Sequence, residues 1–311
     1  MPADISSSAS GTEKAPKLTI VFVNYNTAEL LREALASLAE RPALFGIEVI
    51  VVDNASTEDG GVERADFALP FRLIRNRTNR GYGAAANQGI AQARGTYVAV
   101  ANTDIKFIDN SVELLVHFLQ EEPAAGIVSP LFLWSDLTPQ SPARRFPRIR
   151  YLLAGRRSVI SALFPDWRRS REFTYAGIEQ SPGPVEVEAV FGTFMVAPRQ
   201  LLLDLGGFDE RYAFYVEDVD LCRRVHEAGR KVFVLPRARV IHYLGWARHR
   251  RGMAAEFWRV RGFCRYFRVN YPKLSGLLFF LFAAYLVLLY SASILGLREP
   301  EHSLQRARQA T

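Results

Sequence analysis

The chain has 311 residues, enough for one large domain with an appendage or for two modest domains. Hydrophobic residues make up 49% of it and charged residues 23%, which excludes disorder for most of its length. The formal net charge is +7, but no zinc-finger spacing, helix-turn-helix pattern or RNA-binding aromatic signature accompanies the arginines, so we expect no nucleic-acid partner.

Two features of the sequence bear on the cellular location of the protein: its N-terminal segment and its cysteines. Residues 1–16 contain no apolar run that could act as a secretory signal, and we expect them to form a disordered tail. The two cysteines, Cys222 and Cys264, are far apart in sequence and suggest no disulfide framework. Both features predict a cytoplasmic catalytic part.

Short apolar runs alternate with amphipathic stretches from Leu18 to about Pro130. The runs rich in β-branched residues are typical of strands buried on both faces of a parallel sheet. This alternation predicts an α/β fold with a doubly wound, mainly parallel sheet that binds ligands at the carboxyl ends of its strands. The expected strands are 18–24, 48–54, 71–76, 96–102 and 126–130, and the expected helices are 28–40, 83–93 and 110–121.

The second half of the chain is patterned less regularly. Residues 134–185 are rich in Arg and Pro and are expected to form loops and a short helix beside the site. Further expected elements are strands in 185–198, a helix near 199–205 and a strand pair in 231–243.

The C-terminal part combines a basic flank, 248–273, with an uncharged run, 274–297, and a short tail, 298–311. At ~1.5 Å per residue the run would be ~36 Å long as a helix, enough to cross a ~30 Å hydrocarbon core. A buried core helix or an interfacial hairpin is the alternative. Eight Arg or Lys residues in the flank place the preceding domain, 17–247, on the cytoplasmic side of a membrane.

Polar residues follow the first two expected strands, in the segments VNYN (23–26) and DNAST (53–57). Asp53, at the end of the second strand, is placed to bind a base or ribose, although Asp53 and Ser56 could equally cap a turn. The small residues of NRGYGAAANQG (79–89) allow a close approach to a ligand or to a neighbouring helix. This segment is neither a GxGxxG fingerprint nor a phosphate-binding P-loop, which disfavours NAD and ATP.

Two oxygen-bearing side chains, Asn102 and Asp104, end the fourth expected strand, and His242 ends the last one. Oxygen ligands of this kind suit Mg²⁺ or Mn²⁺ shared with substrate phosphates. Each feature alone is weak, since NxD is common by chance and a single histidine is more often structural.

Three carboxylates, Glu217, Asp218 and Asp220, are crowded in YVEDVDLCRR (215–224). Crowded carboxylates repel one another, which can raise a pKa and produce a usable proton acceptor. A solvated acidic helix start, favoured by the helix dipole, is the alternative.

Together, VNYN, DNAS, NRGYGAAANQG, the NTD form of a DxD motif, GGFDE (206–210) and YVEDVDLC followed by His242 resemble the glycosyltransferases of family 2. The resemblance covers roughly 18–270 and is greatest to non-processive, rhamnosyltransferase-like members with the GT-A fold. Processive synthases are less similar, because the chain has no QxxRW motif.

The resemblance implies a role for each matching position. Asp218 would be the catalytic base and Glu217 its neighbour, while Asp104, Asn102 and His242 would hold Mg²⁺ or Mn²⁺. The neutral Asn102 stands where many members have the first Asp of DxD, which would weaken metal binding. The implied donor-binding residues are Asn24, Tyr25, Asp53, Ser56, Asn79, Gly81, Asn87 and Asn102, and the implied acceptor-binding residues are Gly192, Thr193 and Asp220.

The implied function is an inverting, metal-dependent transfer from a nucleotide-diphosphate sugar, with dTDP-L-rhamnose as the first donor to test. A lipid-linked saccharide is the expected acceptor, in cell-envelope polysaccharide synthesis at the cytoplasmic face of the inner membrane. Two alternatives stay open: a catalytically silent nucleotide-sugar-binding scaffold, and a sugar nucleotidyltransferase. The latter would be expected to carry a Gly-rich, Lys-containing phosphate loop, which VNYN does not offer.

Overall fold

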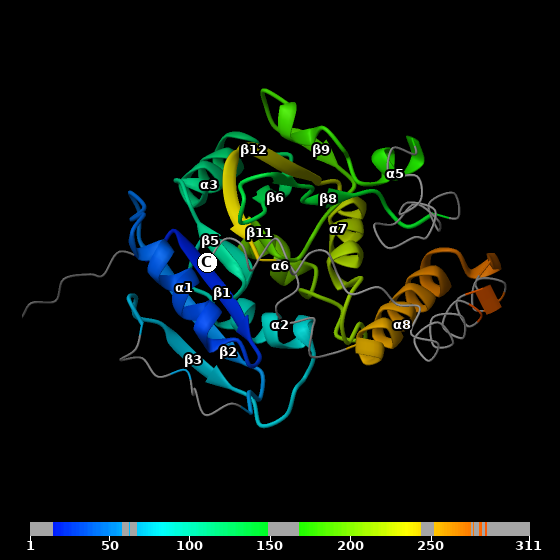
Figure 1. Ribbon diagram of the computed structural model, residues 1–311, viewed down its shortest axis with the longest axis horizontal. Coiled ribbons are helices and arrows are strands. Elements are labelled where there is room, and N and C mark those ends of the chain that lie inside the picture. Colours follow the sequence, from blue (N-terminus) through cyan, green and yellow to red (C-terminus); the bar gives the residue numbers. More distant parts are fainter. Residues whose placement is uncertain are drawn as a thin grey trace, which may run out of the picture.

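A single large β-sheet with helices on both faces organises the chain (Figure 1). The computed structural model describes residues 15–57, 62, 67–148, 168–243, 252–274, 276, 280, 281 and 284. Most of the apolar run predicted at 274–297, both predicted terminal tails and part of the Arg- and Pro-rich segment lie outside the described residues.

The N-terminal half folds as the hydrophobic patterning predicts, with most boundaries shifted by one residue. The strands are β1 (Leu18–Asn24), β2 (Ile47–Asp53), β3 (Arg72–Arg75) and β4 (Tyr97–Asn102), and the helices are α1 (Ala28–Ala39), α2 (Tyr82–Gln92) and α3 (Ser111–Glu121). The short strand β5 (Ile105–Phe107), directly after Asp104, was not predicted.

Several elements of the second half differ in length from those predicted. The fifth strand, β6 (Ala125–Leu133), extends three residues beyond its predicted end. The other elements are β7 (Pro139–Gln140), β8 (Ala143–Arg144), α5 (Arg168–Phe173), η3 (Ile178–Gln180), β9 (Val185–Val187), β10 (Ala189–Val190), β11 (Phe194–Pro198), α6 (Arg199–Asp204), α7 (Glu217–Glu227), β12 (Lys231–His242), α8 (Gly252–Asn270) and η5 (Pro272–Leu274).

The sheet has the order β3-β2-β1-β4-β11-β6-β12-β5. Strands β1 to β4 pair in parallel, as do β6 and β12, whereas β11 runs antiparallel between β4 and β6. The prediction of a strand pair in 231–243 is wrong. Residues 231–242 form one strand, and its register against β6 shifts between Leu235 and Arg239, because Pro236 cannot donate a ladder hydrogen bond.

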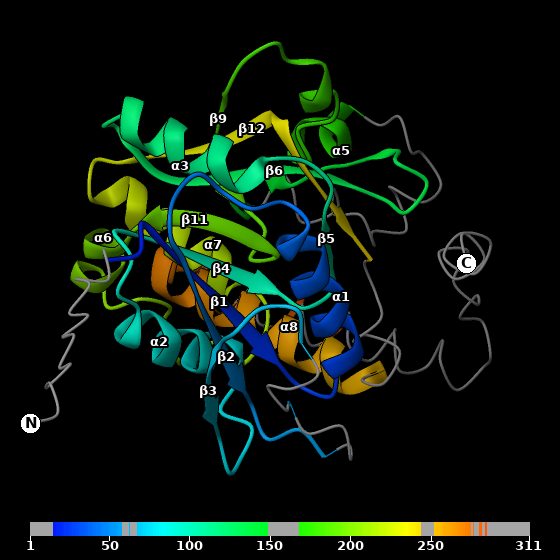
Figure 2. The ribbon, with the colours of Figure 1, turned by 90° about the vertical axis from the view of Figure 1, so that its left-hand side faces the viewer.

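Two apolar clusters fill the spaces on either side of the sheet. One packs α1 and α3 against it, and the other packs α2, α6 and α7 against the opposite face (Figure 2). The expected close packing of the small-residue helix is observed. A Cβ added at Gly89 of α2 would lie 2.2 Å from Val21 Cγ1 of β1, so only glycine fits there.

Helix α8, within the predicted basic flank, packs on the protein rather than standing free. Tyr266 and Phe267 are buried in the cluster on the α7 side. Phe257 and Trp258, nearer the start of the helix, are exposed. Only part of the aromatic content of this flank is therefore available to a membrane.

Candidate active site

Polar residues singled out in the sequence meet at the edge where the parallel strands end. Asn24 ends β1 beside Asp53, the last residue of β2, and Asn102 ends β4 on the other side of β1. His242 ends β12 opposite Ile105, directly after Asp104. The fold therefore brings five strand-end residues to one edge, as expected for an α/β sheet.

Asn24, Asp53 and Ser56 form one hydrogen-bonded group. Asn24 Nδ2 donates to Asp53 Oδ2 at 2.9 Å and to Ser56 Oγ at 3.1 Å, and the Ser56 amide donates to Asp53 Oδ1 at 2.9 Å. Asn24 is fully buried, and Tyr25 beside it is partly exposed. Since each Asp53 oxygen keeps a free lone pair, the group can receive a ribose or base without rearranging.

The neighbouring Asn54 organises the loop that leads into α2. Its buried amide donates to Asn79 Oδ1 at 3.0 Å and to the Gly81 carbonyl at 3.2 Å, and it accepts from Asn76 Nδ2 at 3.0 Å. Gly81 has φ +88° and lies against the Ala213 carbonyl, so glycine is required. The motif DNAS contains Asn54, but nothing in the sequence pattern indicates this role.

Asp104 and His242 form the candidate metal site. His242 Nε2 lies 3.6 Å from Asp104 Oδ1, and both side chains are buried. His242 Nδ1 contacts Gln140 Oε1 at 2.7 Å. Because a glutamine oxygen can only accept, Nδ1 donates to it, and Nε2 is the ring nitrogen that faces Asp104. Gln140 was not singled out in the sequence.

The donor atoms suit a divalent cation. Two ligands at ~2.1 Å from one ion lie about 3–4 Å apart, which includes the observed Nε2–Oδ1 separation. Burial raises the pKa of the Asp104 carboxyl, but the His242 charge and hydrogen bonds, including one from Asn102, bring it below its ordinary value. The hydrogen bond from Asn102 therefore stabilises the charged form of Asp104. Within the described part of the chain no group of three Asp, Glu, His or Cys side chains is placed to hold a metal ion together.

Asp218, at the start of α7, is held by three donors. Its Oδ1 accepts from Arg144 Nη2 at 2.5 Å and from the Val219 amide at 2.8 Å, and its Oδ2 accepts from the Gly192 amide at 3.0 Å. The Arg144 guanidinium also lies over the Phe191 ring, 4.7 Å from its centroid. These contacts give the Asp218 side chain a defined orientation.

The neighbouring carboxyl group, that of Glu217, is buried and has a raised pKa. Glu217 is 7% exposed, and among the described atoms its Oε2 has no hydrogen-bond partner. Burial, and secondly the charge of Asp218, raise the pKa of Glu217 to about 8. The protonated form of Glu217 is therefore favoured at neutral pH.

Tyr82, the first residue of α2, contacts Gly192, the residue whose amide binds Asp218. Its hydroxyl donates to the Gly192 carbonyl at 2.8 Å. Burial raises its pKa well above the ordinary value, and the charges of Glu217, Asp218 and Asp104 add to this effect. Gly192 donates to Asp218, and the carbonyl of the next residue, Thr193, accepts from the Asn102 amide at 2.8 Å, so the candidate base and the strand end that leads to Asp104 lie in one site.

Residues 19–181 match the family model described as glycosyl transferase family 2. The chain belongs to this family. It is 32% identical over 241 residues to the N-acetylglucosaminyl-diphospho-decaprenol L-rhamnosyltransferase of Mycobacterium tuberculosis, a match covering 73% of this chain and 76% of the relative. A pre-mycofactocin glycosyltransferase of the same organism is 28% identical over 72% of this chain and 42% of its own length.

Solved structures agree on the fold. GalNAc-T7 with UDP, GalNAc and Mn²⁺ superposes with a TM-score of 0.58 over 74% of this chain and 44% of its own, at 18% identity. The mannosyltransferase PcManGT of Pyrobaculum calidifontis, solved with GDP-Man and Mn²⁺, gives 0.53 over 96% of this chain and 80% of its own, at 19% identity. The predictions of a GT-A type fold, a family 2 glycosyltransferase and a rhamnosyltransferase-like relative are confirmed.

Two predicted site residues of this glycosyltransferase are engaged in packing contacts. Asn87 exchanges two hydrogen bonds with the backbone of Phe208, at 2.8 and 2.9 Å. Asp220 pairs with Arg224 at 2.8 Å. The structure thus gives them no contact with Asp218 or Asp53, and their substrate roles stay predictions. Thr193, by contrast, lies at the strand ends, where its carbonyl accepts from the Asn102 amide at 2.8 Å.

The turn that introduces the carboxylate pair has unusual backbone geometry. Tyr215 and Val216 have φ values of +68° and +70°. A β-branched residue is rare in this left-handed region, where a non-glycine residue costs about 1–3 kcal/mol unless its surroundings enforce it. The position of Glu217 and Asp218 therefore depends on what packs against this turn.

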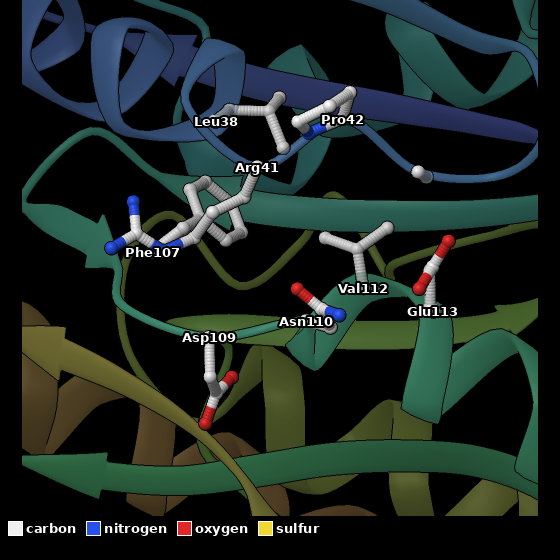
Figure 3. Close-up of a pocket in the computed structure, with 9 residues that line it drawn as sticks. Leu38, Arg41, Pro42, Phe107, Asp109, Asn110, Val112 and Glu113 are labelled. Atoms are coloured by element: carbon white, nitrogen blue, oxygen red, sulfur yellow. The ribbon is translucent and has the colours of Figure 1, made fainter.

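A separate hollow lies between the end of α1 and the start of α3 (Figure 3). It is lined by Leu38, Phe107 and Val112, together with the charged residues Arg41, Asp109 and Glu113. No predicted site residue belongs to this hollow.

No helix within the described residues is long and apolar enough to cross a membrane. The span predicted at 274–297 falls mostly outside those residues and is not tested by them.

Proposed function

We propose that this glycosyltransferase transfers a sugar from a nucleotide-diphosphate donor to a lipid-linked saccharide with inversion at the anomeric carbon. The observation that carries the proposal is the single site containing the Asp104–His242 pair and the oriented Asp218 carboxylate. A silent scaffold would have no need of such a site, and membership of a glycosyltransferase family disfavours a nucleotidyltransferase.

Asp218 acts as the general base. As the acceptor hydroxyl oxygen attacks the anomeric carbon, Asp218 takes its proton, the carbon–oxygen bond to the diphosphate breaks, and the nucleoside diphosphate leaves with that electron pair. Glu217 cannot take this role at neutral pH, because it already holds a proton. One base suffices for such a displacement, unlike the carboxylate pair of a hydrolase.

Asp104 and His242 would hold Mg²⁺ or Mn²⁺. The bound ion would stabilise negative charge on the departing diphosphate. Gln140 fixes the His242 ring so that Nε2 is available, and Asn102 orients Asp104. The two solved relatives bound to Mn²⁺ support this assignment.

The remaining donor-side groups surround the nucleotide. Asn24, Asp53 and Ser56 offer their preorganised hydrogen-bond group to the base or ribose, with Tyr25 beside them. On the acceptor side, Gly192 lies beside Asp218, and an added Cβ there would come within 3.4 Å of Asp218 Cβ.

The first donor to test is dTDP-L-rhamnose, and the first acceptor is a prenyl-diphosphate-linked N-acetylglucosamine. The Mycobacterium tuberculosis relative, an L-rhamnosyltransferase named for N-acetylglucosaminyl-diphospho-decaprenol, supports the choice of sugar and of acceptor. An enzyme that uses a lipid-linked acceptor must reach a membrane. We place this enzyme at the cytoplasmic face of the inner membrane.

An apolar–basic patch, formed by Phe257, Trp258 and Arg261 at the start of α8, suits membrane contact. The rings of Phe257 and Trp258 are 5.6 Å apart, and the Arg261 guanidinium lies over the Trp258 ring at 5.3 Å. All three side chains are exposed. Aromatic rings favour the headgroup level, and an arginine there adds attraction to anionic lipids. The run at 274–297 would reinforce this attachment.

The test is a transfer assay with purified full-length protein, labelled dTDP-L-rhamnose and a short prenyl-diphosphate N-acetylglucosamine acceptor. We expect a labelled product of inverted configuration, loss of transfer after EDTA, and recovery with Mg²⁺ or Mn²⁺. A parallel panel of UDP- and GDP-sugars tests the donor. Full transfer after exhaustive chelation would refute metal dependence, and transfer from another donor alone would refute the rhamnose assignment.

A further inference from the structure

Helix α8 closely approaches the turn that carries the catalytic carboxylates. A Cβ added at Gly262 would lie 3.0 Å from the Tyr215 carbonyl oxygen and 3.2 Å from Val216 Cγ2. Gly262 lies inside the helix and has no positive φ, so the close approach, rather than the backbone conformation, explains the glycine.

A second contact holds the segment that precedes this turn. Arg265, three residues along α8, donates to Asp209 Oδ2 at 3.0 Å, and its guanidinium lies over the Tyr212 ring at 5.3 Å. Both contacted residues lie between α6 and α7. The arginine and its partner are mostly buried, so the ion pair is shielded from solvent.

These contacts supply what the turn needs in order to keep its unusual backbone conformation, namely groups packed against it. Tyr215 and Val216 are consecutive left-handed residues, and they persist only where surrounding groups enforce them. Gly262 contacts both of them, and Glu217 and Asp218 follow directly. A shift of the turn would move the Asp218 carboxylate away from Gly192 and Arg144.

We propose that α8 is a structural part of the active site, in which Gly262 and Arg265 are positioning residues for Asp218. The proposal rests on Asp218 being the base of the proposed transfer. It extends the catalytic unit beyond residues 19–181, the part matched by the family model, and beyond the boundary at 247 expected from the sequence. The strand ends that carry Asp104 and His242 do not depend on this contact.

The first experiment compares Gly262→Ala with Gly183→Ala in the full-length protein. The control adds the same methyl group where nothing lies within 4 Å. Alanine is also the better helix former, so Gly262→Ala does not weaken α8 itself. We expect turnover to fall on the order of 10–10²-fold, the scale of a misplaced catalytic group, with the donor KM unchanged. Gly183→Ala should match the wild type.

The second experiment compares Arg265→Gln with Arg265→Lys. Asp209 pairs with two arginines, the exposed Arg211 and the more buried Arg265. Glutamine removes the charge that links Asp209 to α8, whereas lysine retains it, so lysine should recover part of the turnover lost with glutamine. The proposal is overturned if Gly262→Ala and Arg265→Gln both keep wild-type turnover. It is also overturned if donor KM rises in proportion as turnover falls, since that result indicates general disruption.

Hydrogen exchange provides a readout that does not depend on transfer. Amides of Val219 and Asp220, in the first turn of α7, should exchange faster in Gly262→Ala than in Gly183→Ala. If the wild type transfers no sugar, the proposed function fails. Unchanged exchange in both variants would refute the role of α8 separately.

Discussion

The protonated state of Glu217 leads to a prediction about stability and pH. Replacing Glu217 by Gln keeps the shape of the side chain but removes its ability to ionise. In the wild type, burial and the charge of Asp218 raise the pKa of this carboxyl from 4.5 to about 8. We therefore expect Glu217→Gln to be increasingly stable relative to the wild type as the pH rises.

The sign follows from proton binding. Between pH 4.5 and 8 the unfolded chain has lost the Glu217 proton while the folded chain retains it, so raising the pH favours unfolding. At about 1.4 kcal/mol per pH unit, the wild type loses about 3 kcal/mol by pH 7 and about 5 kcal/mol above pH 8. Below pH 4.5 this contribution is fully present and the two proteins differ least.

The assay is urea unfolding of both proteins from pH 5 to pH 8.5. Glu179→Gln, at a more accessible glutamate of η3, serves as the control and should follow the pH dependence of the wild type. In an Asp218→Asn background the gap should narrow, because one of the two causes of the raised pKa is removed. A gap between Glu217→Gln and the wild type that stays constant with pH would refute the reasoning.

Three further predictions concern activity and location. Asp104→Ala should abolish transfer and the metal-dependent part of donor affinity, measured by calorimetry with and without Mn²⁺; unchanged metal-dependent affinity would contradict the metal site. Asp218→Asn should lower turnover by ~10²–10⁴ with donor binding nearly intact, whereas loss in Glu217→Gln alone would move the base to Glu217. Replacing Phe257 and Trp258 by Ser should reduce flotation with anionic vesicles, most of all in high salt, where the electrostatic attraction is screened; unchanged flotation would remove the patch from the membrane contact.

The strand-end half of the site could be predicted from sequence because its signal is local. Continuous apolar runs mark β1, β2 and β4, and in a parallel sheet their carboxyl ends must meet. Asn24, Asp53 and Asn102 are the first polar residues after those runs, so their convergence follows from the fold class alone.

The partners of the base and of the histidine could not be predicted in this way. Arg144 lies 74 residues from Asp218, and Gln140 lies 102 residues from His242. Both sit on two-residue strands, which are too short to show any periodicity. Their roles depend on long-range packing that a single sequence does not reveal.

The site has two halves: the strand-end residues, and the base Asp218 with its long-range partners. We expect these halves to respond differently to substitution. The strand-end half rests on long, fully buried strands whose polar side chains bind one another, so one altered residue leaves the others in place. The base half rests on short strands, a turn with two left-handed residues, and the contact of α8 with that turn. A small shift in any of these moves Asp218, because no continuous strand fixes its position. Changes in the base half should therefore alter turnover more readily than donor affinity, and acceptor preference can vary there without loss of the nucleotide site.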